Sequence, residues 1–210
     1  MRAFEDRAHA GRELAARLGV FEDREDVVVL GLARGGVPVA AAAGHELRVA
    51  FDAFAVRKLG VPWQKELAFG AVASGGVRVL NDDLVRELPL PAEAIEEIAA
   101  REARELVLRE RSYRGDRPPV ALEGQTVILV DDGIATGSSM RAAVQAVRMS
   151  APAAVLVAVP VGPSQTCADL AREVQRVVCV LTPDPFRAVG VWYEHFDQCT
   201  DEEVRRLLAT

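Results

Sequence analysis

Two neighbouring acids and a run of small hydroxyl residues follow a short apolar segment. Asp131 and Asp132 end the apolar run 127–130, and residues 135–139 then read Ala-Thr-Gly-Ser-Ser. If a strand ends at the acids and a helix begins within 135–139, the helix N-terminus offers unpaired N–H groups and a positive dipole to an anion. The carboxylates beside it suit ribose hydroxyls or hydrated Mg²⁺. The segment therefore predicts a site for a ribose 5-phosphate. The alternative is an ordinary capping turn, which rarely needs two acids followed by several glycine and hydroxyl residues.

A second turn that could hold an anion follows the apolar run 27–30. The turn consists of Ala33, Arg34, Gly35 and Gly36. Its glycine spacing does not fit the GxGxxG fingerprint of dinucleotide-binding proteins. Backbone N–H groups of such a turn can still face an anion, and the guanidinium of Arg34 can hold two phosphate oxygens at once. A plain structural turn is the alternative, but a second phosphate site becomes the better interpretation beside the first.

The elements that must position these residues alternate between buried strands and helices. Continuous Val-rich runs are typical of parallel strands that are covered on both faces. The alternation predicts an α/β fold, doubly wound, with a mainly parallel five-stranded sheet and flanking helices. We expect strands at 27–30, 51–56, 126–130, 154–160 and 176–181, and helices at 8–18, 37–47, 91–113, 137–148, 163–171 and 201–208.

The stretch after the second strand breaks this alternation. Residues 57–69 are interrupted by Gly and Pro and mix charge with Trp63, which predicts an exposed, mobile loop. Residues 70–80 are expected to form a hairpin. Lys58 and Lys65, the only lysines of the protein, both lie in the expected loop.

A segment rich in proline and aromatic residues, about 182–198, follows the last expected strand. Four aromatic residues fall within 186–196, although only 5% of the chain is aromatic. Such a cluster can line a ligand pocket or form a small satellite core, and the sequence leaves both interpretations open. The four residues are Phe186, Trp192, Tyr193 and Phe196.

Composition limits the classes of function. With 210 residues and half of them apolar, one domain covering 1–210 with a sizeable core is the expectation. The formal net charge of −6 gives no basic footprint for nucleic acid. The three cysteines lack metal-binding spacing and are expected to be free thiols in a reducing cytoplasm. Neither a signal-peptide core nor a bilayer-spanning apolar run is visible, so no membrane association is expected.

The segment 127–139 resembles the loop of type I phosphoribosyltransferases that binds phosphoribosyl pyrophosphate (PRPP). The similarity lies in an apolar strand, two acids, two variable residues, then Ala-Thr-Gly and two small hydroxyl residues. The order of strands and helices extends the resemblance over most of the chain. It implies a Mg²⁺-dependent enzyme that transfers the 5-phosphoribosyl group of PRPP to a nitrogenous base or amine, with release of pyrophosphate. A lid at about 57–80 and a small C-terminal hood at about 182–198 would close the site.

The resemblance also implies roles for individual residues. Asp131 and Asp132 would hold the ribose hydroxyls and, through water, the metal ion. The lid of the family closes over the substrate, so Arg57 and Lys58 would join the pyrophosphate loop 33–36, and Arg34 and Lys58 would assist catalysis. The 5-phosphate would lie on Ala135, Thr136, Gly137, Ser138 and Ser139. The acceptor would contact Ile134, Phe186, Trp192 and Tyr193.

The sequence departs from the family at one informative position. Ala135 stands where 6-oxopurine enzymes usually have an acid beside the base, which makes a guanine or hypoxanthine acceptor less favoured. Asp184 or Glu194 could serve an acceptor instead. Because family members are often dimeric, the resemblance leaves a homodimer open.

Two other functions are alternatives to the transferase. A non-catalytic regulator that senses PRPP or a nucleotide on the same fold stays open, although no additional nucleic-acid-binding element is visible. A phosphohydrolase of α/β type is disfavoured. It would need a nucleophilic Asp after the first strand, where Gly31-Leu32-Ala33-Arg34 stands.

Overall fold

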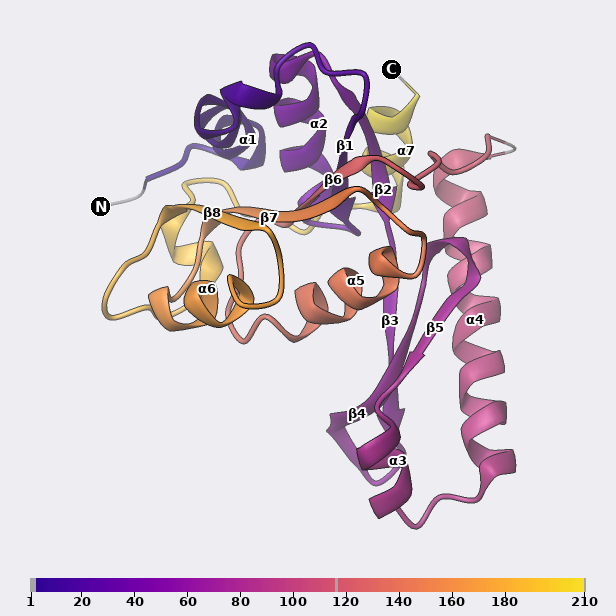
Figure 1. Cartoon of the computed structure of the whole chain (residues 1–210). Coiled ribbons are helices and arrows are strands. Elements are labelled where there is room, and N and C mark those ends of the chain that lie inside the picture. The colour runs from indigo at the N-terminus through magenta and orange to yellow at the C-terminus, as the bar shows by residue number, and fades with distance from the viewer. Residues whose placement is uncertain (1–2, 116, 210) are drawn as a thin grey trace.

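A five-stranded parallel sheet lies at the centre of the body of the protein (Figure 1). The computed structural model describes residues 3–115 and 117–209, and the side chains of these residues except those at 65, 66 and 82. The strands are β1 (Val27–Leu32), β2 (Ala50–Phe54), β6 (Thr126–Val130), β7 (Ala154–Val161) and β8 (Arg176–Leu181). Their order is β2-β1-β6-β7-β8, and each neighbouring pair is parallel. The predicted fold class is confirmed.

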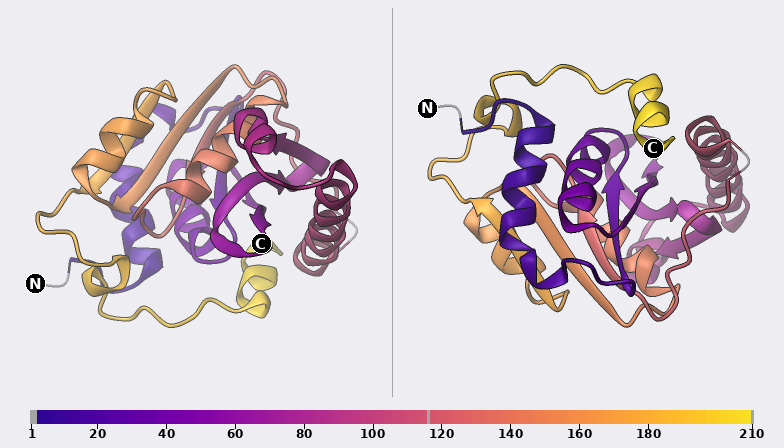
Figure 2. Two further views of the ribbon diagram at one scale, coloured as in Figure 1. Left: turned by 90° about the horizontal axis from the view of Figure 1, so that it is seen from below. Right: turned by 90° about the horizontal axis from the view of Figure 1, so that it is seen from above.

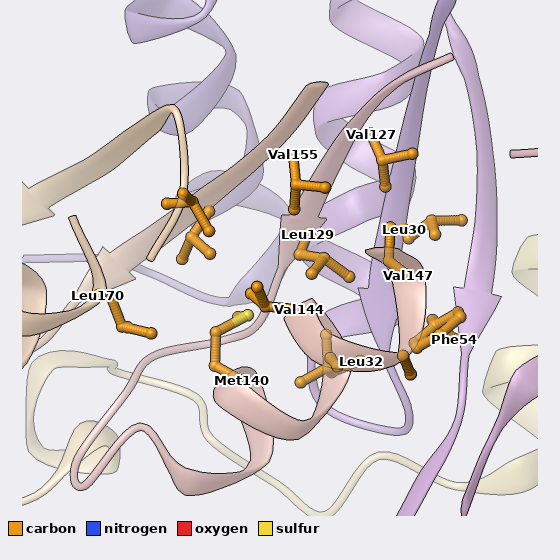
Figure 3. Packing of buried hydrophobic residues seen from close by; sticks show 14 of the residues in the cluster. Leu30, Leu32, Phe54, Val127, Leu129, Met140, Val144, Val147, Val155 and Leu170 are labelled. Carbon is orange, nitrogen blue, oxygen red and sulfur yellow. The ribbon is translucent and has the colours of Figure 1, made fainter. Parts of the chain in front are cut away.

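Helices cover both faces of this sheet. They are α1 (Arg7–Arg17), α2 (Gly36–Leu47), α5 (Ser138–Arg148) and α6 (Ser164–Leu170). The two views in Figure 2 show α1 and α2 over one face, and α5 and α6 over the other. Side chains of β1 alternate between the two cores, since Val29 packs with α1 and α2 and Leu30 packs with α5. In Figure 3, Met140 and Val144 of α5 point toward the sheet.

An antiparallel arm replaces the mobile loop that we expected at 57–69. The arm consists of β3 (Val56–Val61), β4 (Gln64–Ala73), β5 (Val77–Leu80), α3 (Asp82–Glu87) and α4 (Ala92–Arg114), and it projects from the body (Figure 1). The loop prediction was wrong because Leu59, Val61 and Phe69 are buried against α4, which holds the strands in place. The hairpin predicted at 70–80 is confirmed, and its turn is the short helix η2 (Ser74–Gly76).

A buried ion pair joins the arm to the sheet. Arg114, the last residue of α4, donates from Nε to both carboxylate oxygens of Asp52 on β2, at 2.9 Å each. Arg114 also donates to the carbonyl of Ala53 and to Glu110. Both side chains of the Arg114–Asp52 pair are 7% exposed, so each charge depends on the other for solvation.

The C-terminal hood crosses back toward the N-terminus. The hood contains the short helix η3 (Val189–Trp192), and α7 (Asp201–Leu208) follows it. Phe4 pairs with Tyr193 in an isolated parallel bridge, and Phe4 and Glu5 accept the N–H groups of residues 194 and 195. The N-terminal segment is thereby fixed against the hood. The remaining short helix is η1 (Gly19–Phe21).

The other predicted helices and strands are confirmed within a few residues, whereas the sequence did not predict α3 or the short helices η1 and η3. Among the residues that the structure describes, none of the helices is both long and apolar enough to cross a bilayer.

Candidate active site

The loop between β6 and α5 has the shape and the donor groups that an anion needs. Gly137 precedes α5 with a φ of 73°, a conformation that glycine adopts readily, and it turns the chain into the helix. The hydroxyls of Thr136 and Ser138 lie 3.2 Å apart and are exposed, as is Ser139. From outside the loop, Thr166 of α6 donates to the carbonyl of Ala135 at 2.9 Å. Residues 135–139, here called the phosphate cup, thus present a helix N-terminus and three hydroxyls to solvent.

The acidic pair lies at the carboxyl end of β6. The backbone N–H of Asp132 donates to Oδ1 of Asp131 at 2.9 Å. Burial, and next the charge of Asp132, raise the pKa of Asp131 well above the usual carboxyl range. Burial also raises the pKa of Asp132, whereas the guanidinium of Arg7 lowers it. Such a pair needs a cation or hydroxyl donors nearby to stay ionised.

Arg7 supplies that cation, and no motif in the sequence pointed to it. Its Nε lies 2.8 Å from Oδ2 of Asp132, and its Nη1 donates to the carbonyl of Asp197 at 2.7 Å. The guanidinium carbon lies 4.1 Å from the ring centre of Phe196, a cation–π contact. Arg7 comes from the first turn of α1, so the N-terminal segment takes part in the site.

The turn after β1 packs directly on the acidic pair. The Ala33–Arg34 peptide is cis, and the N–H of Ala33 donates to the carbonyl of Phe54 at 3.0 Å. A side chain at Gly35 would collide with the carboxylate of Asp132. A Cβ atom at Gly36 would lie 2.6 Å from the carbonyl oxygen of Val130. The two glycines therefore allow the turn to approach the acids closely.

An open pocket of about 580 Å³ lies between this turn and the hood. Arginines enter it from three elements: Arg7 from α1, Arg34 from the turn and Arg109 from α4. Arg34 has an acidic neighbour, because its Nη1 lies 3.6 Å from Oδ1 of Asp201. The sequence did not single out Arg109, because it lies in a helix rich in charges. The other lining residues are Ala33, Gly35, Asp132, Phe196, Gln198 and Cys199. The pocket suits a polyanionic ligand.

Arg57 and Lys58, the arm residues that we assigned to the pyrophosphate, do not line the pocket at the turn 33–36. Arg57 forms an ion pair with Glu102 of α4, with Nη2 2.6 Å from Oε2. Lys58 donates from Nζ to Oγ of Ser138 at 2.6 Å, which places it at the phosphate cup. The side chain of Lys65 lies outside the described residues. Of the cations predicted for the pyrophosphate, Arg34 is the one that the structure places at that turn.

The proposed acceptor residues are spread over a small apolar cluster in the hood. Tyr193 is 2% exposed, packs on Phe196 at a ring distance of 4.9 Å, and donates its hydroxyl to the carbonyl of Asp132 at 2.6 Å. This geometry gives Tyr193 a supporting place behind the acid. Ile134 is buried, while Phe186 and Trp192 are half-buried in the hood cluster. Acceptor contact by these four residues stays a prediction.

Two turns suited to anions lie beside an acidic pair at the carboxyl ends of β1 and β6, where open α/β sheets commonly bind their ligands. The chain belongs to the phosphoribosyl transferase domain family, whose model matches residues 58–193. The predicted family is confirmed. Arg7 and the turn 33–36 precede the matched range, although they contact the acids within it.

Similar proteins extend the comparison to nearly the whole chain. The crystal structure of TT1426 from Thermus thermophilus is 42% identical, covers 99% of this chain and 98% of its own, and superposes with a TM-score of 0.88. Two curated proteins of Mycobacterium tuberculosis, from strains CDC 1551 / Oshkosh and ATCC 25618 / H37Rv, are named as phosphoribosyl transferases. Each is 47% identical over 204 residues, 97% of this chain. The chain spans about half the length (46%) of these curated relatives.

Proposed function

We propose that the protein binds PRPP and transfers its 5-phosphoribosyl group to a nitrogenous base or amine, with release of pyrophosphate. The observation that carries this proposal is the order of three features along the site. The turn 33–36 packs directly on Asp132, and the chain runs from Asp132 through Gly133 into the phosphate cup. PRPP has the matching order: a pyrophosphate, a ribose with two hydroxyls, and a 5-phosphate. Family membership supports the same reaction.

The chain's own groups act by positioning and by charge stabilisation. The C1–O bond to pyrophosphate breaks, a C1–N bond to the acceptor forms, and the acceptor nitrogen releases its proton to the departing pyrophosphate or to solvent. Positive charge develops on the ribose while negative charge grows on the leaving group. Asp131 and Asp132 accept hydrogen bonds from the ribose hydroxyls and stabilise the positive charge on the ribose. Arg34 and the N–H groups of its turn stabilise the departing pyrophosphate.

The acidic pair also fits Mg²⁺ that keeps most of its shell as water and substrate oxygens. Mg²⁺ in such sites is commonly held by one or two carboxylates together with phosphates. Among the described residues, the structure has no group of three or more residues suited to enclose a metal ion. Asp131 and Asp132 would hold the ion's water shell. When bound, Mg²⁺ would neutralise part of the negative charge of the pyrophosphate.

Calorimetry with PRPP in the presence of Mg²⁺ tests the donor side. The intact protein is expected to bind PRPP. Asp132→Asn should weaken binding because the neutral amide is a poorer acceptor for ribose hydroxyls and for the water shell of the metal. Thr136→Val removes one hydroxyl of the phosphate cup at nearly constant volume and should weaken binding as well. If the intact protein does not bind PRPP, the proposal fails.

A second assay tests transfer. PRPP and Mg²⁺ are incubated with a panel of bases and amines, and the pyrophosphate released is measured. Acceptor-dependent release supports the transferase. PRPP binding without acceptor-dependent release across a broad panel would favour the regulator that the sequence left open.

A further inference from the structure

The phosphate cup has no positive side chain of its own. Its five residues, 135–139, are Ala, Thr, Gly, Ser and Ser. The nearest arginine in the chain, Arg141, is already engaged: Nε donates to Glu173 and Nη1 to the carbonyl of Thr136, both at 2.9 Å. Arg141 lines the same groove as Thr136 and Ser138, but these donors are engaged with the protein's own acceptors. A phosphate dianion in the cup would meet hydroxyls and N–H groups but no charge from within the loop.

The antiparallel arm brings a cation to this place. Nζ of Lys58 lies 2.6 Å from Oγ of Ser138, 80 residues further along the chain. Side chains on a strand alternate in direction. Arg57 and Leu59 face α4, where they contact Glu102 and the apolar cluster of the arm, so Lys58 faces α5. Among the side chains that the structure describes, Lys58 forms no ion pair with a carboxylate. Its charge is available to a ligand.

The surroundings of Lys58 separate it from the pyrophosphate end of the site. A groove of about 960 Å³ between the arm and α5 is lined by Lys58, Thr136 and Ser138. Two arginines also line it, but each has an acidic partner: Arg86 pairs with Asp83 and Arg141 with Glu173. None of the residues of the turn 33–36 lines this groove, and Lys58 does not line the pocket at Arg34. The 5-phosphate and the pyrophosphate of PRPP would therefore meet cations from different elements, the first from the arm and the second from the turn 33–36.

We propose that Lys58 is the cation that binds the 5-phosphate of the donor, delivered to the phosphate cup by the arm. This assignment rests on the proposed function and adds a specificity-determining residue to it. Lys58 would favour donors and products that carry the 5-phosphate, because an ammonium group placed beside hydroxyl donors adds a charge-assisted hydrogen bond that a free ribose cannot use.

Binding of the two halves of the donor tests the assignment. Ribose 5-phosphate and inorganic pyrophosphate are titrated separately, by calorimetry, into the intact protein and into Lys58→Met. Loss of one charge-assisted hydrogen bond is expected to weaken ribose 5-phosphate binding about tenfold. Pyrophosphate binding should not change. Lys58→Arg, which keeps the charge, should restore a large part of the affinity for ribose 5-phosphate.

Arg78→Met is the matched control. Arg78 belongs to β5 of the same sheet and pairs with Glu96 of α4, so its loss also removes one positive charge from the arm. This variant should bind ribose 5-phosphate as the intact protein does. Urea unfolding checks that Lys58→Met keeps the fold; an unchanged midpoint is expected because Lys58 is exposed.

Two results would overturn the assignment. Lys58→Met could lose pyrophosphate and keep ribose 5-phosphate, which would return Lys58 to the leaving group, or it could bind both ligands unchanged. If the intact protein binds neither ligand nor PRPP, the proposed function fails, and that result is distinct from both.

Discussion

Arg7→Met is expected to destabilise the protein at neutral pH through Asp132. The side chains of Arg7 and Asp132 are 14% and 15% exposed. Removing one partner of a buried pair typically costs about 3–5 kcal/mol, and the residual exposure favours the lower end, about 3 kcal/mol. For a chain of this length, that corresponds to a fall in the melting temperature of roughly 6–12 °C. Methionine keeps an apolar contact with Phe196 while removing the charge.

The effect should depend on pH, with a definite sign. The pKa of Asp132 is raised by burial and lowered by Arg7, so the variant has a still higher pKa at this carboxyl. A carboxyl with a raised pKa in the folded state favours folding when protonated, and this contribution is lost as pH rises through the folded pKa. The difference in unfolding free energy between the intact protein and the variant should therefore be largest where Asp132 is ionised, and it should shrink as the pH falls through the raised pKa of this carboxyl.

Urea unfolding of a double-mutant cycle measures the effect. Arg7→Met, Asp132→Asn and the double variant should give a coupling free energy of about 2 kcal/mol, because residues in direct contact couple by about 0.5–3 kcal/mol. Arg12→Met, an exposed position on the same helix, is the control and should change stability by less than about 0.5 kcal/mol. A coupling energy below about 0.5 kcal/mol would refute the view that Arg7 compensates the charge of Asp132.

Three other substitutions probe the contacts around the site. Gly35→Ala places a methyl group against the Asp132 carboxylate and should weaken Mg²⁺-dependent PRPP binding about tenfold in calorimetry; unchanged affinity would contradict the close packing. Tyr193→Phe removes the hydrogen bond to the Asp132 carbonyl and should lower the unfolding free energy in urea by about 1 kcal/mol, and an unchanged value would mean that this carbonyl does not need the hydroxyl. Arg114→Met leaves Asp52 buried without its cation and should cost about 3–5 kcal/mol by the same measurement; a cost below about 1 kcal/mol would count against the buried pair.

The parts of the fold that the sequence predicted are those with local signals. The continuous apolar runs of β1, β6 and β7 identify buried strands without knowledge of their neighbours. The acids after Val130 and the small residues before α5 are similarly local, because strand ends and helix starts are marked by adjacent residue types. The central sheet and the phosphate cup could therefore be predicted together.

The arm shows where local signals fail. Glycine and proline at 60 and 62 are typical of a loop, yet Leu59 and Val61 alternate as a strand does. What holds them is the apolar face of α4, about 35 residues further along the chain, with Ile95 and Ile98 at its centre. Strand pairing in this segment depends on that contact, and propensity alone cannot supply it.

The site contacts that were missed are long-range. Arg7 lies 125 residues from Asp132, and Lys58 lies 80 residues from Ser138. Arg7 was not predicted at all, because an arginine in the first turn of a helix is a common surface feature. Lys58 was predicted as a site residue, but its contact with Ser138 was not. Only the packing of α1 against the hood and of β3 against α5 brings them to the site.

The bridge between the N-terminal segment and the hood has a practical consequence for experiments. The N–H groups of residues 3 and 4 donate to the carbonyl of Trp192 at 3.0 Å, and this pairing lies immediately before Arg7. Trimming a few leading residues, or fusing a bulky partner before them, is usually harmless in an α/β protein. Here removal of residues 3 and 4 would remove the hydrogen bonds that fix the chain just before Arg7, whose guanidinium contacts Asp132. Variants should therefore be compared in a form whose leading residues are unaltered.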